Sequence, residues 1–223
     1  HFDIAGHGDV AGLHLRGAGG RKLEALGAFA FHLQRDLLHV ENDVGHVFTH
    51  ASERGKLVHA VLEDLFELPA AERTIDSARA ALPIRWQEAL TEKPELSTLV
   101  LDEKEWMDRA TSLLQNYFVL EQPHTFESTY RELHLERNLS DEMYLHGYVD
   151  RIDVAPTGQV RIVDYKTGKS PKPGWEEKAL FQLRVYALLY WRLHGVIPAL
   201  LVLHYLGDAR SVKSSPTESE LLA

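Results

Sequence analysis

The sequence predicts an α/β (α+β) protein in which helices flank a mixed central sheet. Apolar residues recur at helical spacing from Glu53 to about Leu68, and a block that reads as helical follows over residues 70–121. Alternating apolar residues then predict three strands, at residues 125–135, 143–154 and 159–166. The last two elements are an amphipathic helix and a buried strand, at residues 176–194 and 199–206. The predicted order is helix, helical insertion, three strands, helix and strand.

Local signals set the expected ends of these elements. The first helix should stop before Pro69, because the residue before a proline leaves the α region. Within the helical block, apolar spacing predicts helices at residues 84–91 and 95–120. A turn is expected at residues 136–141 after the first strand, and a hairpin turn at residues 156–158 joins the next two strands.

The amino-acid composition of the chain excludes several classes of protein and of site. The chain has 223 residues and 44% of them are apolar, which is enough for one domain with a substantial core. It has no run of roughly eighteen apolar residues, so we expect no membrane span. The absence of cysteine excludes a disulfide, a thiolate zinc site and a cysteine nucleophile, and it is consistent with a cytoplasmic protein. The net charge of −9 argues against a general DNA-coating protein, so any contact with nucleic acid must be local.

Two acids and a lysine come together in the hairpin of the second and third strands. Asp164 and Lys166 point to the same side of their strand, since strand side chains alternate. The turn at residues 156–158 places Asp150 across from Asp164. Two carboxylates this close repel each other unless a cation intervenes, and oxygen ligands suit Mg²⁺ or Mn²⁺. An isolated Asp-x-Lys is more often an exposed salt bridge, so the surrounding motifs decide between the two interpretations.

Four motifs around this hairpin occur in a characteristic order. They are Gly55-x-x-x-His59-x-x-x-Glu63, then Gly147-x-x-Asp150-Arg151-Ile152-Asp153, then Asp164-Tyr165-Lys166-Thr167-Gly168-Lys169, and finally Gln182-x-x-x-Tyr186. Together they resemble the RecB-like branch of the PD-(D/E)XK nucleases, which includes the RecB and AddB nuclease domains, CRISPR-associated exonucleases and stand-alone RecB family exonucleases. The resemblance covers residues 51–207, which we expect to form the nuclease domain, with residues 70–121 as a helical insertion.

The resemblance implies a restriction-endonuclease-like αβββαβ core and a metal-dependent DNA nuclease. The expected activity is that of an exonuclease on single strands or unwound ends, in DNA repair, recombination or end processing. The implied ligands of Mg²⁺ or Mn²⁺ are His59, Asp150, Asp164 and the carbonyl of Tyr165.

The remaining motif residues have supporting roles in this hypothesis. Lys166 would help to position a water molecule and to stabilise developing charge, and Gln182 and Tyr186 would hold the strand or orient Lys166. His59 and Glu63 share a helix face, and Glu63 is expected to position His59 or the helix, although it could also reach a second metal. Glu132, on the first strand, is a weaker site candidate that could equally be a solvated strand charge.

The charge changes sign around the third strand, where bases outnumber acids. The candidates for contact with the DNA backbone are Lys169, Lys172, Lys178 and Arg184. Two alternatives stay open at this point. The chain could be a non-catalytic nuclease-fold module that binds DNA or a helicase partner, or a metal-dependent hydrolase of a non-nucleic substrate, which only the negative net charge favours.

The two ends of the chain carry less information. Residues 1–50 show no clear match to the family, although residues 23–38 have the pattern of an amphipathic helix. Related nucleases hold an iron–sulfur cluster with cysteines near both ends of the domain, and this chain has none, so that cluster is not possible here. Either this member never had the cluster or the chain is a fragment. Residues 208–223 are expected to be a truncated tail, part of which could form one more strand or a frayed helix.

Overall fold

A six-stranded mixed sheet lies at the centre of the computed structural model, which describes residues 14–17, 45–140 and 143–222. Five strands run in the order β2-β3-β4-β5-β6, and β1 pairs with the first residues of β3. β4 and β5 are parallel and the other neighbours are antiparallel. The strands are β1 (His14–Gly17), β2 (Tyr130–Ser140), β3 (Met143–Val154), β4 (Val160–Lys166), β5 (Leu200–Tyr205) and β6 (Arg210–Ser214).

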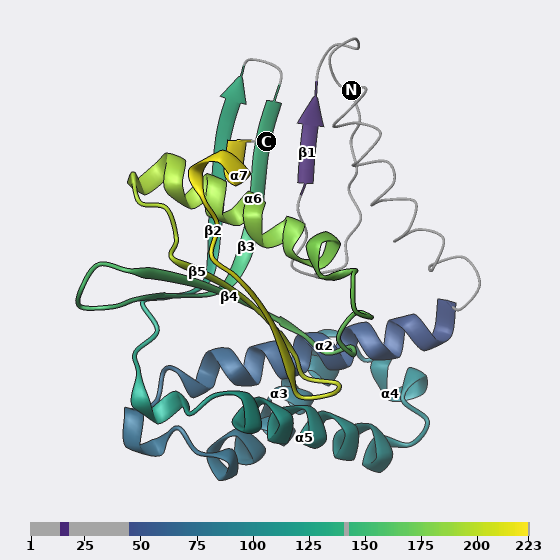
Figure 1. The fold of residues 1–223 in the computed structure, drawn as a ribbon. Helices are drawn as coiled ribbons and strands as arrows, with labels where there is room; N and C mark the ends of the chain where they lie inside the picture. Colours follow the sequence, from purple (N-terminus) through teal and green to yellow (C-terminus); the bar gives the residue numbers. More distant parts are fainter. Residues whose placement is uncertain (1–13, 18–44, 141–142, 223) are drawn as a thin grey trace.

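Helices cover both faces of this sheet (Figure 1). One layer holds α2 (Gly45–Leu65), α3 (Ile75–Glu92), α4 (Leu96–Leu99) and α5 (Glu103–Leu120), and its core includes Val163 and Val202 of the sheet. The other layer holds α6 (Glu176–His194) and α7 (Glu218–Leu222), which pack on the opposite sheet face. The order α2, β2, β3, β4, α6, β5 confirms the predicted α+β fold, with α3 to α5 inserted after the first helix. Within the described residues, none of the helices combines the length and apolar character needed to cross a bilayer.

The helical insertion differs from its prediction at two points. The helix expected at residues 84–91 begins at Ile75, because the side chain of Thr74 caps it by accepting from the Ser77 amide, and Pro83 is tolerated inside it. The single helix expected at residues 95–120 is two helices, α4 and α5. Asp102 separates them by capping α5, with its side chain accepting from the Glu105 amide. In each case a capping side chain, rather than apolar spacing, sets the boundary.

The first strand is also shifted from its prediction. A 3₁₀ turn at Pro123–Thr125 occupies the start of the expected strand, so β2 begins only at Tyr130. Residues 136–140 of the turn expected at residues 136–141 are instead part of β2, where Glu136 lies opposite His146 of β3. The tail contains both β6 and α7. The helix expected at residues 23–38 lies outside the described part of the chain.

A buried ionic network joins the end of α5 to the sheet. Arg151 of β3 is 1% exposed, and its guanidinium contacts the carboxylates of Glu121 (2.8 Å) and Asp153 (3.1 Å). Arg161 of β4 reaches the same two carboxylates, at 3.2 and 2.7 Å. Burial alone would raise the pKa of Glu121, but His204 at 3.3 Å and the two guanidinium groups lower it to about 2.

We predict that Glu121 makes folding stability fall in acid. Because the pKa of Glu121 is lowered in the folded state, its contribution is complete above its ordinary pKa of 4.5 and is lost as the pH falls towards 2. Glu121→Gln should therefore lower the free energy of unfolding at pH 7 by about 3 kcal/mol and flatten the stability curve between pH 4.5 and 2. Urea unfolding at each pH measures both effects.

Glu105→Gln is the matched control. Glu105 lies on the exposed side of the same helix and pairs with Arg109 one turn away, so its substitution should cost at most about 0.5 kcal/mol. A Glu121→Gln curve parallel to that of the wild type across this pH range would contradict the assignment.

Candidate active site

Asp150 and Asp164 face each other where β3 and β4 stop pairing. The ladder pairs Arg151 with Val163, and one step further along the same register Asp150 lies opposite Asp164, as the hairpin pattern predicts. The Tyr165 amide donates to Asp150 Oδ2 at 2.6 Å, so a side chain satisfies this amide of β4. Both carboxylates are buried, and Asp164 is 0% exposed.

Side chains from two further elements reach Asp150. His59, on α2, places Nδ1 3.5 Å from Asp150 Oδ1. Its ring meets the edge of the Tyr165 ring, with centroids 5.9 Å apart. Glu132, on β2, completes a group of three in which one donor atom each of His59, Glu132 and Asp150 lies within 4.8 Å of the others. The neighbouring strands β2 and β3 and the distant helix α2 therefore converge on one point.

The backbone of Glu132 explains how this side chain joins the group. Arg131 pairs with Arg151 and Leu133 with Val149, so Glu132 lies opposite Asp150 between two regular pairs. Its φ of 44° is in the left-handed region, where a residue with a side chain is strained by about 1–3 kcal/mol. In the sequence analysis Glu132 is only a weaker site candidate, because no local pattern signals this conformation.

Four other motif residues form a hydrogen-bonded chain on the α6 side of the sheet. Lys166 Nζ lies 2.7 Å from Asp164 Oδ2 and donates to Gln182 Oε1 at 3.1 Å. Gln182 Nε2 in turn donates to the Tyr186 hydroxyl at 2.7 Å. The structure thus connects Asp164, Lys166, Gln182 and Tyr186 in a line, beside the group that contains His59.

Gly147 leaves space for the ring of Tyr186, the last residue of this hydrogen-bonded chain. A Cβ atom on Gly147 would lie 2.6 Å from the ring of Tyr186, so no side chain fits there while Tyr186 keeps its place. Tyr186 is fully buried, and its ring therefore packs directly on the backbone of β3. This contact accounts for the glycine three residues before Asp150.

The charges of the cluster shift the pKa values of its members. Burial alone would lower the pKa of His59, but Asp150 and Asp164 raise it to about 9. Burial raises the pKa of Asp164 to about 6 in spite of Lys166, while the pKa of Asp150 falls because His59, Lys166 and the Tyr165 amide outweigh its burial. Burial and repulsion from Asp150 raise the pKa of Glu132 to about 7. The site therefore carries excess negative charge that favours a bound cation.

Comparison with known families agrees with this geometry. A family model described as the PD-(D/E)XK nuclease superfamily matches residues 27–222. The chain belongs to this superfamily. A search of curated proteins finds no match for it. Members of the PD-(D/E)XK superfamily are mostly nucleases and other hydrolases, and its nucleases use divalent metals.

The residues of this PD-(D/E)XK chain fit a divalent cation. Among the described residues, neither Asp150 Oδ1 nor Asp164 Oδ1 accepts a hydrogen bond, although both atoms are buried and His59 Nδ1 lies 3.5 Å from Asp150 Oδ1. The carbonyls of Val160 and Lys166 accept from amides on the β5 side, so the intervening Tyr165 carbonyl points towards β3 and Asp150. Carboxylate and carbonyl oxygens with one imidazole suit Mg²⁺ or Mn²⁺. The group within 4.8 Å contains Glu132 beside His59 and Asp150, whereas Asp164 is paired with Lys166.

The four candidate DNA-binding residues do not share one surface. Lys169, Lys172 and Lys178 are exposed, on the segment that follows β4 and on the first turn of α6. Lys178 lies one turn before Gln182, on the same face of α6. Arg184 lies about 200° around the helix from Gln182, and it is paired with Glu177. On α6, therefore, Lys178 but not Arg184 lies on the face of Gln182, while Lys169 and Lys172 lie on the segment between β4 and α6.

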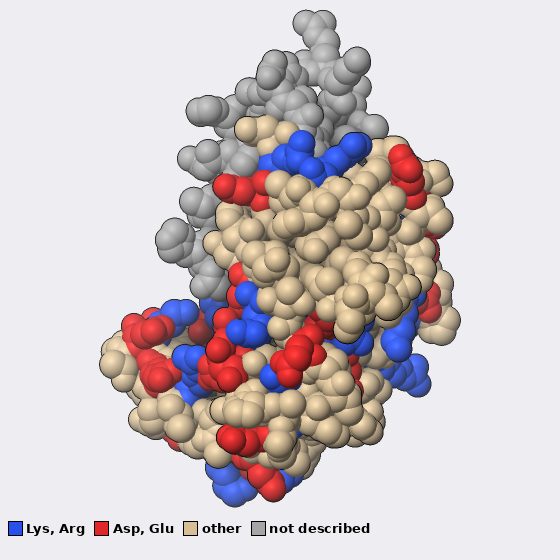
Figure 2. Space-filling view, turned by 90° about the vertical axis from the view of Figure 1, so that its left-hand side faces the viewer, with Lys and Arg blue, Asp and Glu red and all other residues tan. Residues whose placement is uncertain are grey.

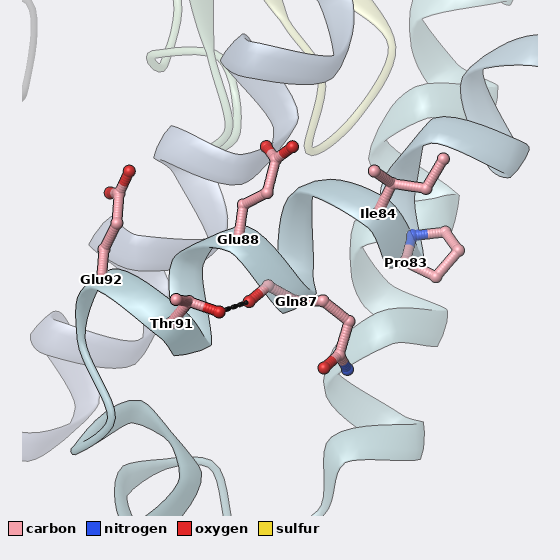
Figure 3. Close-up of a pocket in the computed structure, with 6 residues that line it drawn as sticks. All are labelled: Pro83, Ile84, Gln87, Glu88, Thr91 and Glu92. Carbon is pink, nitrogen blue, oxygen red and sulfur yellow. Dashed lines mark hydrogen bonds between the residues drawn. The ribbon is translucent and has the colours of Figure 1, made fainter.

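The hollow on α3 is not part of this site (Figure 3). All of its lining residues come from one helix of the insertion, and none is a motif residue: Pro83, Ile84, Gln87, Glu88, Thr91 and Glu92. The one hydrogen bond drawn there joins Thr91 to the Gln87 carbonyl within the helix, at 2.8 Å. With no basic group in its lining, the hollow offers no cation to hold a phosphate.

We predict that Gly147→Ala destabilises the protein and disturbs Tyr186. The added methyl group would overlap the Tyr186 ring, and overpacking of this kind costs about 1–3 kcal/mol. Gly168→Ala is the control, because a Cβ there has nothing within 4 Å. Chemical unfolding should show a loss for Gly147→Ala and almost none for Gly168→Ala. Equal stabilities of the two variants would contradict the packing described for Tyr186.

Proposed function

We propose that this chain is a metal-dependent DNA nuclease of the RecB-like branch. In this proposal it acts as an exonuclease on single strands or unwound ends, in DNA repair, recombination or end processing. The observation that carries the proposal is the convergence of His59, Glu132 and Asp150 on one point, beside buried carboxylate oxygens that lack a donor. The line from Asp164 through Lys166 to Gln182 adds a fixed cation next to this group.

The proposed roles follow from these contacts. His59, Glu132, Asp150 and the Tyr165 carbonyl would hold Mg²⁺ or Mn²⁺, with Asp164 next to them. When bound, such an ion lowers the pKa of a water molecule and offsets charge on the phosphate.

Lys166 is the fixed cation of the proposed site. Burial alone would lower its pKa, but Asp164 and Asp150 raise it, so the side chain stays an ammonium group that can stabilise developing negative charge. Gln182, anchored by Tyr186, fixes the direction of that ammonium group.

A non-cutting module that binds DNA or a helicase partner is the rival proposal. The buried cluster of His59, Glu132 and Asp150, with Asp164 and Lys166 beside it, supports an enzyme, because a module that only binds DNA does not need a buried cluster of acids. This sequence contains no cysteine, so it offers no ligand for the iron–sulfur cluster of related nucleases.

We predict that Asp150→Asn abolishes cleavage. The change keeps the shape of the side chain but removes the charge that holds the metal, so cleavage should fall by roughly a hundredfold or more, beyond the loss typical of supporting residues. The measurement is digestion of end-labelled single-stranded and duplex DNA with Mg²⁺ or Mn²⁺, and EDTA should stop it in the wild type.

Asp108→Asn is the matched control, since Asp108 lies on the exposed face of α5 and pairs with Lys104. This variant should cut at the wild-type rate. A folded wild-type protein that leaves every DNA substrate intact in both metals would favour the non-cutting rival.

We predict that Lys166→Ala impairs turnover and that Lys172→Ala impairs DNA binding. Lys166→Ala should leave DNA affinity nearly unchanged while turnover of bound DNA collapses, because Lys166 is held inside the site by Asp164 and Gln182. Lys172→Ala should weaken binding about equally for all sequences while turnover of bound DNA persists. With three or four phosphate contacts, the slope of log affinity against log salt should be roughly −2 to −3 for single strands, and Lys172→Ala should make it shallower. Similar losses of affinity for both variants, with turnover intact, would contradict the proposed role of Lys166.

A further inference from the structure

Trp175 is an unusually exposed tryptophan. It lies between β4 and α6, and 59% of its surface is exposed. The chain has four tryptophans, of which Trp86 and Trp106 are buried in the helical insertion and Trp191 is partly buried on α6. Large aromatic residues normally bury most of their surface, so an exposed indole ring suggests a binding partner.

The segment that presents Trp175 is held in place at several points. The Gly207 amide donates to the Gly168 carbonyl at 3.0 Å, and a Cβ on Gly207 would lie 2.5 Å from that oxygen, so the two backbones pack closely. Asp208 accepts from the amide and the hydroxyl of Ser170, at 3.1 and 2.7 Å. The Trp175 amide donates to the Lys172 carbonyl at 3.1 Å. Trp175 is thus presented on an anchored segment, with more than half of its surface exposed.

The charges around Trp175 favour an anionic partner. Lys169, Lys172 and Lys178 are all exposed within ten positions of the chain. The two acids that follow Trp175 are engaged, since Glu176 accepts from the Gly174 amide at 2.6 Å and Glu177 pairs with Arg184. Elsewhere the charges are mixed, and Figure 2 shows acidic and basic side chains interspersed over the lower half of the face turned to the viewer. Cations therefore gather locally in a chain whose net charge is −9.

This surface is continuous with the candidate active site. The segment at residues 167–175 connects Lys166, at the end of β4, to α6, whose Gln182 accepts from Lys166. Trp175, Lys178 and Gln182 follow one another at helical spacing, so they lie along one face of α6. Trp175 is about two turns, or roughly 10 Å, from Gln182 along the helix axis. A strand whose phosphate lies beside Lys166 would pass the indole ring with a neighbouring nucleotide.

We propose that Trp175 stacks on a base of single-stranded DNA while Lys169, Lys172 and Lys178 contact the adjoining phosphates. The proposal rests on the proposed nuclease function and names its substrate as a strand with unpaired bases. In a duplex the faces of the bases are stacked on each other, so an indole ring cannot reach them. Stacking on an aromatic ring tolerates every base, and a basic groove beside it follows the backbone.

Binding without cleavage tests the proposal. In EDTA, the affinity of the whole chain is measured for a short oligothymidine and for an abasic strand with the same phosphates. The wild type should bind oligothymidine more tightly by roughly five- to hundredfold, the range expected for stacking on one base. Trp175→Leu should lose this preference and keep the affinity for the abasic strand, whereas Trp175→Phe should keep part of it. The intrinsic fluorescence of the wild type should be quenched by oligothymidine, and this quenching should disappear in both variants.

Two controls separate stacking from other effects. Tyr130→Leu removes an aromatic ring of similar exposure, 40%, that lies near Tyr190 of α6, and it should leave both affinities unchanged. Lys172→Ala should weaken binding of both strands equally. A wild type that binds the two strands equally, or a Trp175→Leu variant that keeps the preference, would overturn the proposal. Cleavage is scored separately with Mn²⁺. Base-dependent binding without cleavage would support stacking by Trp175 and contradict the proposed nuclease activity. Cleavage without base-dependent binding would contradict stacking by Trp175 and support the nuclease activity.

Discussion

The structure depends on two carboxylates, Asp150 and Asp164, that are buried side by side where β3 and β4 stop pairing. A buried carboxylate costs several kcal/mol unless it is hydrogen-bonded or paired. Here the Tyr165 amide and His59 stabilise Asp150, and Lys166 stabilises Asp164. Because these partners belong to different elements, α2 and β4 cannot shift relative to β3 without leaving a buried charge unpaired. The same contacts that make the pair tolerable therefore fix the geometry of the site.

Tyr165 connects the two buried carboxylates to the core. Its amide holds Asp150, its ring packs against the rings of His59 and Tyr117, and its hydroxyl accepts from Arg151, the residue after Asp150. Arg151 is held in turn by Glu121, at the end of α5. The helical insertion thus supports the site from behind through a buried ionic network. Removing one partner from such a network leaves the remaining buried charges unpaired. A substitution far from the cluster can therefore affect it.

The parts of the structure with a regular pattern could be predicted from the sequence, and those with a singular conformation could not. β3 and α6 begin and end where alternation and helical spacing predict, because one face of each packs on the core. The convergence of His59 with Asp150 follows from motif order. Glu132 could not be assigned to the group with confidence, since its position depends on a strained backbone that no neighbouring residue signals. The role of Glu121 was also missed, because its partners lie 30 or more positions away in the chain.

The charge of the cluster separates two tasks in the proposed nuclease. The acids raise the pKa of His59 to about 9, so a proton on the imidazole offsets part of their charge, and a divalent ion must compete with that proton. Until a cation offsets the acids, they repel a phosphate that approaches them. The exposed lysines of residues 167–178 lie outside this buried group, where solvent and salt screen them from the acids. Attraction of the DNA backbone and neutralisation of the reacting phosphate thus come from different parts of the chain. For that reason affinity should persist when the metal is removed, while the chemical step should not.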